Sequence, residues 1–143
     1  MTLHPDRLLP IEPEARGIAR ELFADVEKLP ILSPHGHTEP VWYARNEAFS
    51  DPVSVSARPD HYIFRLLYSQ GVPMQALGIP DRNGVPTHTD NRAIWRTFAK
   101  HWYLFRATPS RIWFEHALES IFGITERLTE ANADALYDRI AAA

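Results

Sequence analysis

The 143-residue sequence contains no cysteine, so disulfide bonds and thiolate metal sites are excluded. It has no excess of positive charge, since 15 lysines and arginines against 18 aspartates and glutamates give a formal net charge of −3. That balance disfavours broad electrostatic binding to nucleic acid or to an anionic membrane. No window approaches the roughly 20 apolar residues of a membrane-spanning helix, and residues 1–10 lack the apolar core of a secretory signal. We therefore expect a cytoplasmic protein with no nucleic-acid or membrane partner.

Proline and histidine are frequent, with 12 and 7 residues. Proline at this frequency predicts short helices separated by breaks. Apolar residues at three- and four-residue spacing predict helices over 13–28, 60–70, 90–106, 109–122 and from 129 onward. A shorter helix is expected at 39–47 after an N-cap at Thr38, and a single turn at 73–77. The fold is thus expected to be mostly α-helical, at a length typical of one domain.

The apolar stretch 29–33 is too short for a helix between two prolines and predicts the one β-strand. A lone strand leaves its backbone groups unpaired, so it needs partner strands that this chain does not supply. The last expected helix runs into three alanines, 141–143, with no glycine, asparagine or proline to end it. Both features indicate a truncated chain.

Two histidines, His35 and His37, follow the predicted strand with a single glycine between them. Because alternate residues of a strand point to one face, the two imidazoles could bind one divalent ion. The alternative is a tight turn in which both rings are satisfied by backbone carbonyls, since seven histidines produce this spacing by chance quite often. No other histidine has a spacing that nominates it as the third ligand of a catalytic zinc.

A second candidate site is the segment from Asp60 to Arg65. Asp60 can cap a helix while His61 and Tyr62 project from the first turn, and Arg65 follows three residues after Tyr62. A tyrosine beside a cation can move a proton or bond a sugar hydroxyl, and arginine donors match a carboxylate. The alternative is an ordinary amphipathic helix with Tyr62 half-buried and Arg65 in solvent.

Aromatic residues recur at helical spacing between 95 and 114, with basic residues between them. Nucleic-acid binding is one interpretation, but a core seam with a solvated basic side is the better one. On the second of these helices the spacing places Trp113 and Ile121 on one side, with Phe114 beside them. Arg106 and Arg111 flank the turn at 108–109, and no pattern assigns them to a site.

Four segments resemble the N-terminal part of uronate isomerases, which form the glucuronate isomerase family of the amidohydrolase superfamily. They read "LPILSPHGHTEP", "PDHYIFRLLYSQGV", "FGITERL" and "ADALYDRI". The resemblance covers nearly all of the chain. An His-x-His at a strand end, followed by Asp-His-Tyr-x-x-Arg and a helical stretch, is far more specific than either motif alone.

The resemblance implies a fragment of a metal-dependent (β/α)8 barrel. Residues 1–38 would form an N-terminal arm, the first helix and the first barrel strand, and residues 39–143 a helical insertion cut short at its C-terminal end. Such enzymes interconvert D-glucuronate with D-fructuronate, and D-galacturonate with D-tagaturonate, through a cis-enediol in hexuronate catabolism. A small uronate is then the substrate, and a homo-oligomer is compatible with the family.

By the same resemblance, His35 and His37 match the metal ligands of the first strand, and the remaining ligand lies outside this chain. The expected cofactor is a divalent metal, with zinc preferred. His61 and Tyr62 match the active-site pair, in which Tyr62 moves a proton between two substrate oxygens, and Arg65 is a substrate-binding candidate. As a separate polypeptide the chain is expected to be inactive.

Two other classes remain. The chain could be a non-catalytic helical module that binds a partner, with His35 and His37 purely structural. It could also be a hydrolase of the same superfamily, which would share the His-x-His. The Asp60–Tyr62 segment and the helical insertion argue against the hydrolase.

Overall fold

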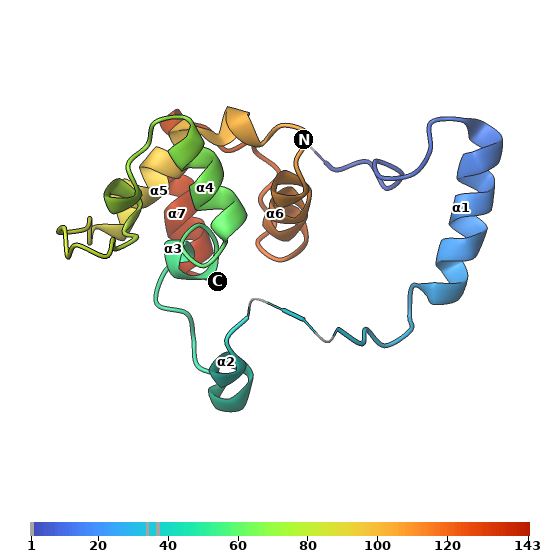
Figure 1. The fold of residues 1–143 in the computed structure, drawn as a ribbon. Coiled ribbons are helices and arrows are strands. Elements are labelled where there is room, and N and C mark those ends of the chain that lie inside the picture. Colours follow the sequence, from blue (N-terminus) through green and yellow to red (C-terminus); the bar gives the residue numbers. More distant parts are fainter. Residues whose placement is uncertain (1, 34, 37) are drawn as a thin grey trace. The chain divides into compact units, whose positions relative to one another are not determined.

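The computed structural model describes residues 2–33, 35–36 and 38–143, which fall into two units (Figure 1). The first unit is Thr2–Gly36, and the second comprises the described residues from Thr38 to Ala143. Regular structure in the described ranges is entirely helical. No helix in these ranges has the length and apolar character needed to cross a bilayer.

The first unit contains one helix, α1 (Pro13–Val26), as the periodicity predicts. Proline begins it, and the Glu12 carboxylate accepts hydrogen bonds from the backbone N–H groups of Glu14 and Ala15, at 3.0 and 2.6 Å. No residue of α1 is buried, and its large apolar side chains, Ile18, Leu22, Phe23 and Val26, are more than half exposed. This face is therefore unpartnered within the unit.

The strand predicted at 29–33 is wrong, because the residues over this range have no regular structure. The side chains of Ile31 and Leu32 are 92% and 91% exposed. A strand is defined by hydrogen bonds to a neighbouring strand, and the described residues supply none. The sequence pattern is that of a strand, but the partner that would make it one is missing.

The second unit consists of short helices and 3-10 turns. In chain order these are α2 (Pro40–Arg45), α3 (Pro52–Val55), α4 (His61–Ser69), η1 (Met74–Leu77), α5 (Asn91–Lys100), η2 (Trp102–Phe105), α6 (Pro109–Ser120), η3 (Glu130–Asn132) and α7 (Ala133–Ala141). Their ends follow local chemistry. Asp60, Asp90 and Thr108 cap α4, α5 and α6 through their side chains. Gly71 and Gly123, just past α4 and α6, have φ of +89° and +62°, which only glycine adopts without strain.

Three predicted boundaries are corrected. The N-cap of α2 is Glu39, one residue after Thr38, because Pro40 takes the first helical position. The helix predicted over 90–106 breaks at His101, where a ring nitrogen donates to the Thr97 carbonyl at 2.8 Å and the chain tightens into η2. The final helix is preceded by the 3-10 turn η3, since Thr129 and Asn132 form a reciprocal capping box.

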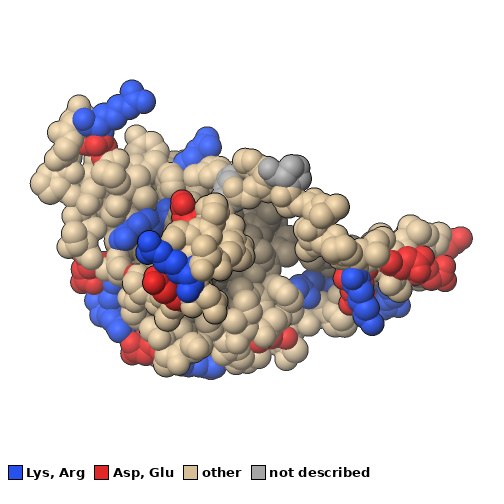
Figure 2. Space-filling model, turned by 90° about the horizontal axis from the view of Figure 1, so that it is seen from below, with Lys and Arg blue, Asp and Glu red and all other residues tan. Residues whose placement is uncertain are grey.

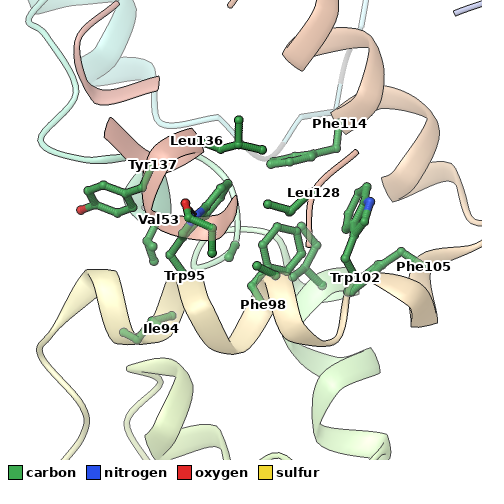
Figure 3. Packing of buried hydrophobic residues seen from close by; sticks show 14 of the residues in the cluster. Val53, Ile94, Trp95, Phe98, Trp102, Phe105, Phe114, Leu128, Leu136 and Tyr137 are labelled. Atoms are coloured by element: carbon green, nitrogen blue, oxygen red, sulfur yellow. Dashed lines mark hydrogen bonds between the residues drawn. The ribbon is translucent and has the colours of Figure 1, made fainter. Parts of the chain in front are cut away.

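The core of the second unit is aromatic and centres on α5. Trp95 and Phe98 are fully buried and point from α5 toward α6 and α7, where they meet Phe114 and Tyr137 (Figure 3). Their ring centroids lie 5.4 to 6.1 Å apart, which is the range of favourable aromatic pairs. The tightening into η2 brings Trp102 into the same cluster. Core packing is therefore confirmed as the role of this aromatic seam.

The buried side of α6 is formed by Phe114 and Leu118, with 4% of each exposed. Trp113 and Ile121, which the spacing places on one side with Phe114 beside them, are 40% and 71% exposed. The structure therefore shows that the side with Phe114 and Leu118 faces the core.

Basic residues on the outer side of α5 pair with acidic residues of α7. Arg96 contacts the Asp134 carboxylate at 2.9 Å, and Arg92 contacts Asp138 and lies over the Tyr137 ring at 4.3 Å. Basic and acidic side chains lie next to each other on the face drawn in Figure 2. Two of the basic residues between the aromatics, Arg92 and Arg96, thus lie on the solvated side of α5, as the preferred interpretation predicts, and pair with α7.

Candidate functional site

The first turn of α4 carries the predicted Asp-His-Tyr group. Asp60 has extended backbone angles, and its carboxylate accepts the Tyr62 backbone N–H at 2.8 Å. The Asp60 carbonyl accepts the N–H groups of Ile63 and Phe64, at 3.0 and 3.2 Å. Asp60 therefore satisfies several of the donors that a helix start leaves unpaired, and it fixes the backbone of the two residues that follow it.

Burial of the opposite side of α4 sets the direction of the site residues. Ile63 and Leu67 are fully buried in the core. Tyr62 precedes Ile63 by one position and is 63% exposed, and the rings of His61 and Tyr62 lie 4.3 Å apart at 33°. The structure therefore brings His61 and Tyr62 together and presents the tyrosine hydroxyl to solvent.

A cavity of about 740 Å³ borders this turn. Residues of five helical elements and the segments between them line it: Thr38, Trp42, Val55, Ser56, Pro59, Asp60, Tyr62, Leu66, Phe105, Thr108, Pro109, Ser110 and Trp113. The wall is mostly apolar. Its polar side chains include the Asp60 carboxylate and the hydroxyl-bearing residues Thr38, Ser56, Tyr62, Thr108 and Ser110. Its size is within the range of small-molecule sites, and Tyr62 contributes its phenol to that wall.

Arg65 lies one turn beyond Tyr62 on α4 and is exposed. It is not among the described residues that line the cavity. The structure thus places Arg65 on the same helix as His61 and Tyr62, as the spacing predicts, without giving it a contact that would assign it to a substrate.

The predicted metal ligands belong to a different part of the chain. His35 is exposed in the first unit, close to its C-terminal end, and its carbonyl accepts a hydrogen bond from the Ser33 hydroxyl. His37 lies outside the described residues, and with it the geometry of the His35–His37 pair. In the ranges that are described, no group of three or more histidine, aspartate or glutamate side chains is placed to hold a metal ion. His35 and His37 therefore remain predicted ligands.

Several cavity residues were not predicted as site residues from the sequence. Trp42 and Trp113 line the cavity from α2 and α6. Thr108 does so from the turn that Arg106 and Arg111 flank, a turn that no sequence pattern assigned to a site. Arg111 itself pairs with Glu115, at 2.7 Å between its Nη2 and a carboxylate oxygen, and lies over the Trp102 ring.

Comparison with known proteins identifies the class of protein to which this arrangement belongs. The family model described as glucuronate isomerase matches residues 14–143. Uronate isomerase of Brucella canis is 67% identical over 141 residues, which cover 99% of this chain and 30% of that protein. Uronate isomerase of Mesorhizobium japonicum is 55% identical over 137 residues, covering 96% of this chain and 29% of its own length. The chain belongs to the glucuronate isomerase family, a family of sugar-acid isomerases.

Solved structures agree with this assignment. The crystal structure of glucuronate isomerase from Caulobacter crescentus superposes with a TM-score of 0.89 at 52% identity, over 99% of this chain and 29% of the other. The uronate isomerase of Thermotoga maritima gives 0.79 at 25% identity over the same shares. The helical arrangement described above is thus that of the corresponding part of these enzymes. The chain spans about 30% of the length of the curated relatives that it matches.

Proposed function

We propose that this chain supplies the segments around His35–His37 and Asp60–Arg65 to a cytoplasmic uronate isomerase, which interconverts D-glucuronate with D-fructuronate and D-galacturonate with D-tagaturonate. The family match over residues 14–143, with 67% identity to a uronate isomerase, carries the proposal. The exposed Tyr62, fixed by the Asp60 cap beside a cavity, supports it. The remainder of the relatives' length, with the barrel strands that we expect there, has no counterpart in this chain.

The reaction requires a base, a group that moves a hydroxyl proton, and positive charge near the developing enediolate, and this chain has candidates for the last two. A proton must leave the carbon next to the carbonyl and return to its neighbour, and a second proton must move between the two oxygens of the enediol. A tyrosine hydroxyl that both donates and accepts suits the second transfer. Tyr62 would hold and move that proton, and His61, with its ring 4.3 Å away, would orient or share it. Arg65 would face the substrate carboxylate, for which its paired N–H groups are suited.

His35 and His37 would hold a divalent metal, with zinc as the expected ion. Imidazole nitrogens are common zinc ligands, and a catalytic zinc takes three protein ligands and leaves one position open. Two histidines therefore fit part of such a site, and the further ligand would come from outside this chain. When bound, the ion supplies Lewis-acid polarisation of substrate oxygens. We expect the 143-residue chain by itself to show no turnover, because it lacks that ligand and the general base.

A chimera tests the role of Tyr62. The matching segment of the Brucella canis enzyme is replaced by this chain, and conversion of D-glucuronate to D-fructuronate is measured. Tyr62→Phe removes the hydroxyl and keeps the ring, so turnover should fall by roughly 10²-fold or more. Tyr68→Phe is the matched control, since it removes an exposed hydroxyl from the same helix, and it should leave the rate unchanged. A near-normal rate for Tyr62→Phe would reject the proton-transfer role.

Metal content of the same chimera tests the predicted ligands. His37→Ala should lower the bound metal per chain, measured by elemental analysis, because one imidazole ligand is lost. His88→Ala removes an exposed histidine of the loop before α5 and is the control. Equal metal content in His37→Ala and in the parent chimera would show that His37 is not a ligand.

A further inference from the structure

Arg58 makes a hydrogen bond that connects two parts of the second unit. It lies between α3 and α4, two residues before Asp60. Its Nη2 donates to the side-chain carbonyl oxygen of Asn91, the first residue of α5, at 2.5 Å. The two residues are 33 positions apart in the sequence. The contact therefore ties the segment that leads into the His61–Tyr62 turn to the helix that carries the core.

The connection continues through Asn91 to Asp51. The Asn91 amide nitrogen donates to Asp51 Oδ2 at 2.8 Å, and Asp51 Oδ1 caps α3 by accepting the N–H groups of Val53 and Ser54. The Arg58 backbone N–H donates to the Val53 carbonyl at 3.0 Å. The hydrogen bonds thus form a closed circuit from Arg58 through α5 and α3 back to Arg58.

The circuit restrains the start of α4 because the connection to it is short and stiff. Only Pro59 separates Arg58 from the cap Asp60, and the proline ring fixes its own φ. Asp60 then holds the Tyr62 N–H directly. A displacement of the Arg58 backbone, which the circuit holds at both its N–H and its side chain, is therefore passed to Tyr62 with little flexible chain to absorb it.

The surroundings of Arg58 show that stability alone does not explain an arginine here. Its Nε is buried and has no hydrogen-bond partner among the described residues, which costs free energy. Gly78 leaves the space for it, since a Cβ at that position would lie 3.1 Å from Arg58 Nη2. A methionine would fill the same space without a buried orphan donor.

We propose that Arg58 is a positioning residue for Tyr62, acting through Asn91 and Asp51. The proposal rests on the proposed function, which gives Tyr62 its role in proton transfer. A positional error of about 1 Å in a reacting group can reduce a rate by up to about 10²-fold. Arg58 itself touches neither substrate nor metal in this proposal.

The first experiment uses the 143-residue chain and its Asn91→Ala variant, in which the substitution lies at least 27 positions from the amides whose exchange is measured. Amide hydrogen exchange at Ile63 and Phe64, whose N–H groups bond the Asp60 carbonyl, should accelerate about tenfold, with Phe98 unchanged. Asn83→Ala, in an exposed loop, is the matched control and should have no effect. Parent-like exchange at Ile63 and Phe64 in Asn91→Ala would overturn the proposal.

Two substitutions of Arg58 repeat the test from the other end of the bond. Arg58→Met should accelerate exchange at Ile63 and Phe64 as Asn91→Ala does. Arg58→Lys keeps one donor for Asn91 and should restore protection to within about threefold of the parent. Equal exchange in the methionine and lysine variants would show that the hydrogen bond is not what holds the turn.

The second experiment is a double-mutant cycle in the chimera. Arg58→Met should lower kcat about tenfold and change KM less than about threefold, and in a Tyr62→Phe background it should add less than about twofold. The same loss in both backgrounds would reject positioning through Tyr62, and the proposed function would stand. A Tyr62→Phe chimera with a near-normal rate would instead reject the role of Tyr62 on which this inference rests.

Discussion

Replacing Trp95 by phenylalanine tests whether the aromatic core, rather than the surface ion pairs, holds α7 on α5. Trp95 is fully buried, and its indole N–H donates to the Ala133 carbonyl at the start of α7, at 2.8 Å. Its ring contacts Phe114 of α6 and Tyr137 of α7. One side chain thus joins three helices by packing and by a buried hydrogen bond.

The expected loss of folding stability in Trp95→Phe has two parts, a lost hydrogen bond and lost apolar burial. A phenyl ring removes the indole hydrogen bond to the Ala133 carbonyl, which costs about 0.5–1.5 kcal/mol because that carbonyl still accepts a backbone N–H within α7. The lost ring atoms remove about 2 kcal/mol of apolar burial, at about 0.8 kcal/mol for each group of CH₂ size. We expect Trp95→Phe to lower the free energy of unfolding by about 2.5–3.5 kcal/mol, a large share of the stability of a domain.

Urea unfolding followed by far-ultraviolet circular dichroism measures the effect. With a slope of about 2 kcal/mol per molar urea, the unfolding midpoint should fall by about 1.2–1.8 M. Trp113→Phe makes the same chemical change at a side chain that is 40% exposed, and it should shift the midpoint by less than about 0.5 M. Equal midpoints for the two variants would refute the assignment of Trp95 as the main link between these helices.

Two further predictions concern stability. Gly78→Ala should lower the free energy of unfolding by about 1–2 kcal/mol for its positive φ, and by a further 1–3 kcal/mol or so for crowding, because the new Cβ would lie 3.0 Å from Ile94 Cδ1. Gly84→Ala, at a similar φ but in open space, should show only the first of these two losses. Equal losses for the two variants in urea unfolding would contradict the crowding at position 78. Arg96 hydrogen-bonds Asp134 and lowers the pKa of that carboxyl below its ordinary value of 3.8. The ionised Asp134 therefore stabilises the folded state fully above pH 3.8, and this contribution is lost as the pH falls through the lowered folded-state pKa. Asp134→Asn should therefore lose less stability than the parent on acidification below about pH 4, and equal acid sensitivity of the two proteins would count against this.

Local signals in the sequence predict most of the helices and the start of the candidate site. Asp60 caps α4 as predicted, and Asp90 and Thr108 cap α5 and α6 at the predicted helix starts, because a side-chain oxygen before an apolar-periodic run satisfies the first N–H groups whatever surrounds it. The same local rule placed His61 and Tyr62 together on the first turn of α4. Such features depend on a few neighbouring residues, so one sequence is enough to find them.

Features that depend on distant residues could not be predicted. The stretch over 29–33 has the composition of a strand, but strand formation depends on a partner, and none is present among the described residues. The break at His101 depends on a core, built from several helices, that takes up Trp102. The bond between Arg58 and Asn91 joins residues 33 positions apart, and no periodicity indicates it.

The most direct test of the proposed function compares D-glucuronate to D-fructuronate conversion by the chimera with that by the 143-residue chain alone. If this chain supplies the Asp60–Arg65 turn and the His35–His37 pair in a working arrangement, the chimera should retain at least about a tenth of the Brucella canis enzyme's rate. A tenfold difference in rate corresponds to about 1.4 kcal/mol in the activation free energy. The isolated chain should show none. A folded, metal-loaded chimera without turnover, or an isolated chain that isomerises glucuronate at a comparable rate, would contradict the proposal.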